Sequence, residues 1–90
     1  MSLEIVQSTR FKRDIKKIKK QGKSISELKT LISILARKSP LPEKYKDHCL
    51  SGDYSNYKEC HIRPDWLLIY KITDNELQLA RTGSHSELFK

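Results

Sequence analysis

Three strand-like segments near the end of the chain leave few folds open to it. They are YKECHIR at 57–63, WLLIYKI at 66–72 and ELQLAR at 76–81. Each is rich in β-branched, aromatic or alternating apolar residues, and short turns around Pro64-Asp65 and Asp74-Asn75 separate them. Strands joined by such tight turns run antiparallel. The sequence therefore predicts a three-stranded antiparallel sheet.

The first 22 residues are predicted to form a strand and a helix. Residues 3–7 alternate weakly and indicate a short strand. Ser8 or Thr9 can cap the helix, and Gly22 can end it. The apolar positions with helical spacing are Phe11, Ile15 and Ile18.

A second helix follows before Pro40. Ser24 and Glu27 have the spacing of a capping box. Its apolar positions are Ile25, Leu28, Leu31, Ile32 and Leu35. Residues 41–57 contain turn formers and no sustained period, which predicts an ordered loop. Together the segments predict an α+β fold of order β-α-α-β-β-β over one domain, residues 1–90, with a helical hairpin packed on one face of the sheet.

Counting residues across two-residue turns predicts the faces of this sheet. Arg63 then pairs with Trp66, and Leu68 lies between His61 and Arg81. One face collects His61, Arg63, Trp66, Tyr70 and Arg81. The other face, which suits packing against the helices, collects Cys60, Ile62, Leu67, Ile69 and Ala80. We therefore expect the polar residues on the uncovered face.

The charge of the chain is concentrated in its first predicted helix. The whole sequence has 18 basic and 11 acidic residues, a net charge of +7. Residues 10–23 hold eight basic residues and one acidic residue, so they carry +7 by themselves. Such a face repels itself, whereas solvated helix faces usually mix signs. The charge favours a polyanionic partner, which would be RNA, DNA or an acidic protein.

The sequence gives no support to membrane insertion, secretion or metal binding. No stretch approaches the roughly 18 apolar residues of a membrane span, and the start MSLEIVQS lacks the features of a signal peptide, so we expect a cytoplasmic protein. Two cysteines are too few for a disulfide framework and are expected to be free thiols. The pairs His48-Cys49 and Cys60-His61 lack the usual zinc spacing, so we expect no metal and no cofactor.

The second half of the chain holds a set of residues suited to acid–base chemistry. They are His48, His61, Asp65, Arg81 and His85. Histidine exchanges protons near neutral pH, and arginine holds a phosphoryl group by two hydrogen bonds. A base, an acid and a cation are the groups needed to cleave RNA without a metal, through attack of the 2′-hydroxyl on the adjacent phosphorus. The aromatic residues that could stack on splayed bases are Tyr57, Trp66, Tyr70 and Phe89.

These residues belong to a longer pattern with fixed spacings. Residues 45–89 contain KDH, then L-x-G, then HxxPDWLLIY, then RTGSHSxLF. The pattern resembles the YafQ-type toxins of bacterial toxin–antitoxin pairs, within the RelE/ParE superfamily. The resemblance implies a RelE-like toxin domain with endoribonuclease activity, an mRNA interferase that cuts translated messages in the ribosomal A site. It also implies a cognate acidic antitoxin that holds the toxin inactive, and operator DNA bound only through the antitoxin complex.

The resemblance also implies which residues form the site. The catalytic residues would be His48, His61, Asp65, Arg81 and His85, and the RNA-binding residues would be Lys46, Trp66 and Phe89. From their charge, we assign His85 as the general acid and Arg81 to the phosphate. Asp65 with His61 or His48 would supply the base.

A ParE-like toxin that acts on DNA gyrase without cutting RNA is the main alternative. It would share the fold and the basic charge, but it would not need three histidines with Asp65 and Arg81. A DNA-binding repressor is a third interpretation, and the sequence has no helix-turn-helix pattern to favour it.

Overall fold

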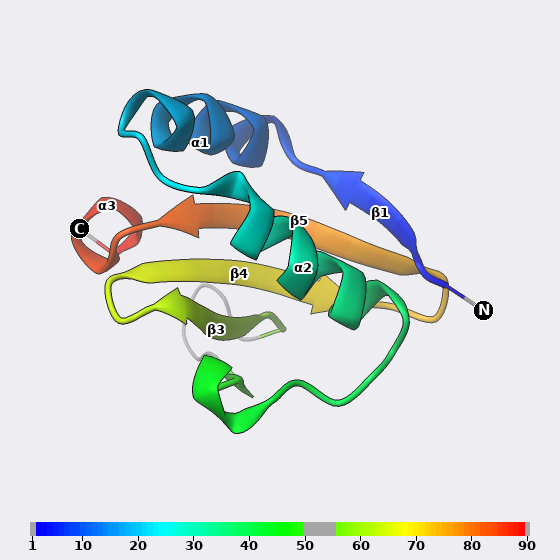
Figure 1. The fold of residues 1–90 in the computed structure, drawn as a ribbon. Helices are drawn as coiled ribbons and strands as arrows, with labels where there is room; N and C mark the ends of the chain where they lie inside the picture. Colours follow the sequence, from blue (N-terminus) through cyan, green and yellow to red (C-terminus); the bar gives the residue numbers. More distant parts are fainter. Residues whose placement is uncertain (1, 50–55, 90) are drawn as a thin grey trace.

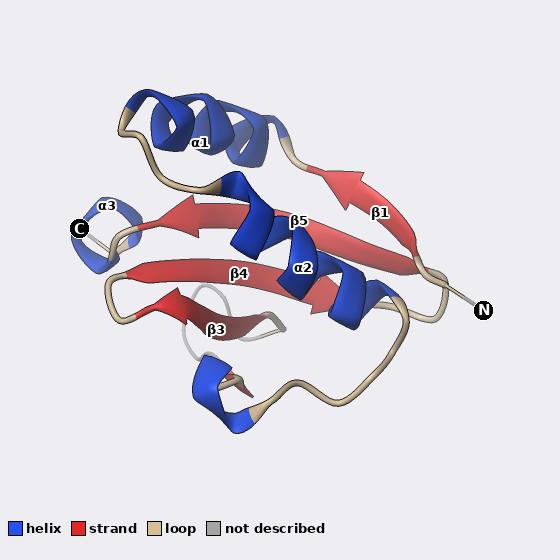
Figure 2. Ribbon diagram, viewed as in Figure 1, coloured by secondary structure: helices blue, strands red, loops and turns tan. Residues whose placement is uncertain are grey.

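The fold is a five-stranded sheet with two long helices on one side (Figures 1 and 2). The computed structural model describes residues 2–49 and 56–89, and for residues 48 and 49 it describes the backbone alone. Within these residues the elements are β1 (Glu4–Gln7), α1 (Thr9–Lys20), α2 (Ile25–Ala36), the short helix η1 (Glu43–Tyr45), β2 (His48–Cys49), β3 (Lys58–Arg63), β4 (Trp66–Ile72), β5 (Glu76–Gly83) and α3 (His85–Leu88). The strand order is β1-β5-β4-β3-β2, with β1 parallel to β5 and all other neighbours antiparallel. The predicted α+β fold is confirmed.

Helix α1 begins and ends where the sequence predicts. The hydroxyl of Ser8 accepts a hydrogen bond from the backbone N–H of Phe11 at 3.0 Å. The helix stops before Gly22, which has a positive φ of 78° that L side chains rarely adopt. Phe11 and Ile18 are buried against the sheet, and the basic residues therefore lie on the outer side of the helix.

Helix α2 also has the predicted extent and begins after the predicted cap residue, but the predicted capping box does not form. Ser24 is the N-cap, yet its side chain makes no capping hydrogen bond. The Ser24 hydroxyl instead meets the Ser26 hydroxyl at 2.7 Å, and the Glu27 carboxylate pairs with Arg63 of β3. The tertiary ion pair has replaced the local capping interaction.

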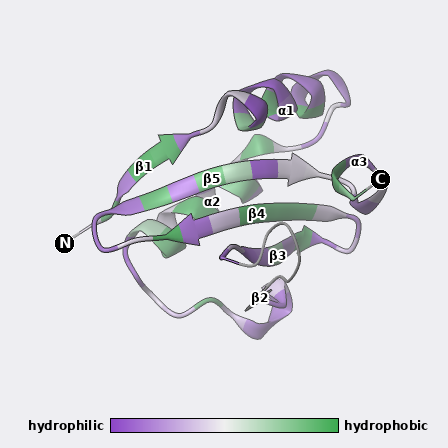
Figure 3. Ribbon diagram, turned by 180° about the vertical axis from the view of Figure 1, so that it is seen from behind, coloured by the Kyte–Doolittle hydropathy of each residue, from purple (hydrophilic) through white to green (hydrophobic). Residues whose placement is uncertain are grey.

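The sheet is covered on both faces in its middle. Under α1 and α2 lies the main core, whose members from β4 are Trp66, Leu68 and Tyr70. The opposite face carries a smaller apolar cluster of Leu67, Ile69 and Leu88, with Tyr57 and Ala80 beside it. Figure 3, which views the sheet from behind, shows β4 as a largely hydrophobic strand, with α3 beyond the end of β5.

The predicted faces are therefore partly wrong. Next to each turn the two strands pair in the predicted register. At the β3–β4 turn, for example, Arg63 pairs with Trp66. A register shift between His61 and Arg63 then moves His61 opposite Leu67, and a second shift between Ile69 and Tyr70 moves Arg81 opposite Ile69. Each shift displaces the pairing by one residue, which reverses the faces of the strand beyond it. Trp66 and Tyr70 consequently face the helices, and Arg63 reaches α2.

Three short elements were not predicted. The segment expected to be a loop contains η1 and the two-residue strand β2, and residues 50–55 of that prediction lie outside the described part of the chain. Helix α3 follows β5 directly. Among the described residues, no helix is both long and apolar enough to cross a membrane.

Candidate functional site

The register of the sheet brings two of the predicted catalytic residues, His61 and Arg81, to one face. Across the strands, His48 of β2 pairs with Glu59 of β3, and Glu59 with Ile69 of β4. Arg81 of β5 pairs with Ile69 in turn. Directly opposed residues share a face, so His61, opposite Leu67, lies on the same face as Arg81. Two strand spacings, about 10 Å, separate the backbones of β3 and β5.

His61 is partly buried beside a carboxylate. Its Nε2 lies 4.0 Å from Oε2 of Glu59, and the exposed fractions of the two side chains are 20% and 5%. A groove of about 620 Å³ opens next to His61, and its cationic lining residues are Lys44, Lys46 and Arg63. The predicted RNA-binding residue Lys46 is thus beside His61, at the end of η1.

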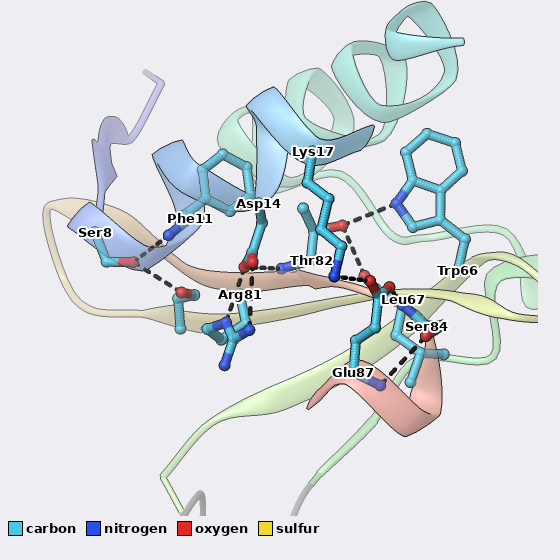
Figure 4. A network of polar contacts seen from close by, with 11 residues as sticks. Ser8, Phe11, Asp14, Lys17, Trp66, Leu67, Arg81, Thr82, Ser84 and Glu87 are labelled. Atoms are coloured by element: carbon cyan, nitrogen blue, oxygen red, sulfur yellow. Dashed lines mark hydrogen bonds and ion pairs between the residues drawn. The ribbon is translucent and has the colours of Figure 1, made fainter. Parts of the chain in front are cut away.

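Arg81 is held by helix α1. Its Nε–H donates to Oδ2 of Asp14 at 2.8 Å, and its Nη2 donates to Oδ1 at 3.3 Å (Figure 4). The same Asp14 oxygen Oδ2 accepts the backbone N–H of Thr82 at 3.1 Å. β1 pairs with β5 only as far as Leu79, so Asp14 satisfies a strand N–H that lies beyond the end of β1.

His85, the first residue of α3, lies beside Phe89, which caps the C-terminus of that helix. Their ring centroids are 5.1 Å apart, and both side chains are exposed. The backbone N–H of His85 donates to Oδ1 of Asp65 at 3.4 Å, so the β3–β4 turn and α3 meet at this end of the sheet. The structure therefore joins Asp65, His85 and Phe89 in one group.

A capping box fixes the start of α3. The Ser84 hydroxyl accepts the backbone N–H of Glu87 at 3.2 Å, and Oε1 of Glu87 accepts the backbone N–H of Ser84 at 3.0 Å. Gly83 has a φ of 155°, and a Cβ there would lie 3.2 Å from Glu87 Oε1. A glycine at this position allows the sharp passage from β5 into α3.

Glu87 also forms an ion pair with Lys17 of α1. The hydrogen bond from Lys17, with that from the Ser84 backbone, lowers the pKa of Glu87 from 4.5 to about 2. Because the folded pKa lies below the ordinary value, the stabilisation is complete above about pH 4.5 and is lost as the pH falls towards 2.

We therefore predict that Glu87→Gln is less stable than the parent at pH 7 and that the difference shrinks between pH 5 and about pH 2. The expected difference at pH 7 is about 1–2 kcal/mol, because a quarter of the Glu87 side chain is exposed and solvent weakens the pair. Urea unfolding at several pH values measures it. Glu4→Gln, at an exposed position on β1, controls for the loss of one negative charge, and a difference that does not change with pH would contradict the prediction.

Trp66 occupies a different place from the one predicted. Its side chain is 3% exposed, and its Nε1–H donates to Oγ1 of Thr82 at 2.9 Å. The Thr82 hydroxyl in turn donates a hydrogen bond to the carbonyl of Leu67 at 2.8 Å. The indole thus links two strands beneath the helices and presents no open ring for a base. Tyr70, 1% exposed and donating to Asp47, is equally unsuited to stacking.

The cysteine and histidine pairs do not form a described metal centre. Cys60 is fully buried in the main core, while its neighbour His61 points to the other face, so the two cannot approach one ion. Burial raises the pKa of the Cys60 thiol far above its usual range, and the charges of Asp47 and Glu59 add to this. No group of three possible metal-ligating residues occurs among the described residues. The side chains of His48 and Cys49 lie outside them.

Sequence reasoning missed the carboxylates that hold the site. Asp14 is the one acid in the basic segment 10–23, which could have marked it as a residue with a specific partner. Ser84 and Glu87 have the S-x-x-E spacing of a capping box. Glu59 carried no signal of its own, because only the strand register brings it to His61.

The fold and the comparison with protein families place the chain in a class, the small toxins of bacterial toxin–antitoxin pairs. Residues 3–90 match the family described as the bacterial toxin of type II toxin-antitoxin system, YafQ, and the chain belongs to this family.

Relatives extend over nearly the whole chain. The mRNA interferase toxin YafQ of Escherichia coli K12 is 42% identical over 87 residues, 96% of this chain and 95% of the relative. The toxin in the crystal structure of the E. coli DinJ-YafQ toxin-antitoxin complex superimposes with a TM-score of 0.91 at 41% identity, covering 100% of both chains. A metal-bound toxin from Helicobacter pylori has a TM-score of 0.91 at 45% identity, covering 97% of this chain and 99% of the other.

Proposed function

We propose that this type II toxin is an endoribonuclease that cleaves mRNA on the ribosome by attack of a 2′-hydroxyl on the adjacent phosphate. The whole chain would act as one RelE-like domain in the cytoplasm. The observation that carries the proposal is the common face of His61 and Arg81, with His85 and Asp65 at the end of the same sheet. The mRNA interferase activity named for the E. coli relative supports it.

The proposed roles divide between the two ends of this face. His85 on exposed α3 would protonate the departing 5′ oxygen, and Arg81 would stabilise the charge on the phosphate. His61 is the base we favour between the two histidines, because the Glu59 carboxylate near its Nε2 would stabilise the imidazolium formed on proton uptake. His48 and Asp65 stay candidates for the same step. None of these roles requires a metal.

RNA binding would use the positive charge of helix α1 and the exposed aromatic ring of Phe89. The outward residues of α1 supply a concentrated positive field for a phosphate backbone. Lys46 lies beside His61 in the groove, and Phe89, 37% exposed and next to His85, offers a surface on which a base could stack. Both fit a single strand that passes the catalytic face.

A cognate acidic antitoxin is the expected partner. The structure of the related toxin in complex with DinJ supports this, as does the charge of α1, which suits an acidic segment that folds on contact. Operator DNA would be reached only through that complex. The gyrase alternative is not favoured, because two relatives that align over 96% of the chain are named mRNA interferase toxins.

Brief expression of the toxin should produce new RNA 5′ ends in frame within translated messages. Cutting in the ribosomal A site would place each cut at a fixed position in a codon. Sequencing of 5′ ends from a reporter message measures this, and the same message without its start codon is the control. Equal cutting of the untranslated control would contradict ribosome dependence, and intact messages with damaged DNA would support the gyrase alternative.

A further inference from the structure

Helix α1 contacts the segment that carries Arg81 and His85 at two ion pairs. Asp14 binds Arg81 of β5, and Lys17 binds Glu87 of α3 (Figure 4). Asp14 and Lys17 are three residues apart, so they lie on the same face of the helix. The two pairs have opposite polarity, acid on base and base on acid. Helix α1 therefore has a fixed position along this segment.

The Asp14–Arg81 pair is well enclosed. The side chains of Arg81 and Asp14 are 20% and 13% exposed, in contrast to 60% for Lys17. Asp14 binds the Nε edge of the guanidinium with both carboxylate oxygens and takes the Thr82 N–H with one of them. Arg81 is thus tied both to a helix and, through Asp14, to its own strand.

We propose that Asp14 is a positioning residue for Arg81. This inference rests on the proposed function, in which Arg81 stabilises the charge on the scissile phosphate. An arginine side chain has many rotamers, and a phosphate contact helps only when the guanidinium is already in place. By binding the Nε edge, Asp14 sets the plane and the direction of the guanidinium before the RNA arrives.

The location of Asp14 argues for this specific role. It is the one acidic residue among eight basic residues at positions 10–23, on a helix whose charge suits a polyanion. It lies in the second turn of α1, beyond the first turn where a carboxylate is favoured by the helix dipole. Its position therefore serves the contact with β5, and a neutral residue would leave the rest of the helix more attractive to RNA.

The test is a double-mutant cycle between Asp14→Asn and Arg81→Ala. Single-turnover cleavage of ribosome-bound mRNA is measured over a range of toxin concentrations, below the unfolding temperature of each variant. Asp14→Asn should lower the maximal rate about 10- to 100-fold and leave the half-saturating concentration nearly unchanged. In the Arg81→Ala background the same change should alter the rate by less than about twofold, because the residue that Asp14 positions is gone.

A second measurement reports the contact without any reaction. The Nε–H of Arg81 should give a protected resonance in the ¹H–¹⁵N spectrum of the free toxin, and Asp14→Asn should cause that resonance to exchange rapidly with water. Asp74→Asn is the matched control, the same chemical change at an exposed residue in the β4–β5 turn, and it should keep both the rate and the resonance.

The outcomes separate the positioning role from the proposed function. Equal slowing by Asp14→Asn in both backgrounds would mean that Asp14 supports the fold alone, and this would overturn the inference. An unchanged or higher rate in Asp14→Asn would also overturn the inference. If Arg81→Ala were still slow in that case, the proposed phosphate role of Arg81 would stand. If Arg81→Ala cleaved at the parent rate, both the phosphate role of Arg81 and the positioning role would fail.

Discussion

Replacing His85 by alanine is expected to slow mRNA cleavage about 100- to 10,000-fold and to leave the fold intact. The imidazole would be the acid that protonates the departing 5′ oxygen. His85 is exposed on α3, and alanine keeps the backbone N–H that contacts Asp65. The substitution also removes the ring contact with Phe89, but both side chains are exposed, so this loss should cost the fold little. Single-turnover cleavage on programmed ribosomes gives the rate, and thermal unfolding gives the stability.

Ser86→Ala is the matched control for this substitution. Ser86 is exposed on the same short helix, and its hydroxyl contacts that of Ser84 at 3.3 Å. The control should retain nearly the parent rate. A large loss in both variants would show that α3 tolerates no change, whereas a parent-like rate in His85→Ala would remove the general acid from the mechanism.

The local part of the fold could be predicted because its signals are local. The helices have one apolar face, a cap or a stop residue, and prolines or glycine after them, so α1 and α2 lie within a few residues of the predicted limits. Strand β4 has the predicted limits, residues 66–72. The Pro64-Asp65 turn fixes its first pair, Arg63 with Trp66.

The faces of β4 could not be predicted from the same pattern. Residues 66–70 are all apolar and all buried, because helices cover one face and α3 with its neighbours covers the other. A continuous apolar run has no alternation that tells the two faces apart. The register alone had to decide, and one-residue shifts in β3–β4 and β4–β5 changed it beyond the turns. His61 and Arg81 still share a face, because each lies beyond the shift in its own strand pair, counted from the turn, and both are therefore displaced by one residue.

The supporting residues depend on contacts between distant parts of the chain. Asp14 and Arg81 are 67 positions apart, and Glu27 and Arg63 are 36 apart. Two S-x-x-E patterns show how such contacts determine whether a capping box forms. At Ser84 both capping hydrogen bonds form, whereas Glu27 turns to Arg63 and the box at Ser24 does not. The local pattern is the same, but Glu87 binds Lys17 and still accepts the Ser84 N–H, whereas both carboxylate oxygens of Glu27 bind Arg63.

Replacing the 2′-hydroxyl beside the scissile phosphate by hydrogen is expected to abolish cleavage at that codon. The proposed mechanism uses this hydroxyl as the nucleophile, and neither Arg81 nor His85 can substitute for it. Binding should change little, because phosphate contacts and stacked bases supply most of the affinity and are retained. A ribosome programmed with a single deoxy-substituted A-site codon measures the effect, and the same substitution two nucleotides away is the control.

The ends of the products give an independent reading of the same step. Attack by the 2′-hydroxyl leaves a 2′,3′-cyclic phosphate or a 3′-phosphate upstream and a free 5′-hydroxyl downstream. Water activated by a bound metal would more often leave a 5′-phosphate, would tolerate the deoxy substitution and would stop on addition of a chelator. Undiminished cutting of the deoxy-substituted codon would therefore sink the mechanism built on His61, Arg81 and His85. The mechanism expects three results together: no cutting of the deoxy-substituted codon, normal cutting of the RNA that carries the control substitution, and 5′-hydroxyl ends on the downstream product. These results require the nucleophile to come from the RNA itself.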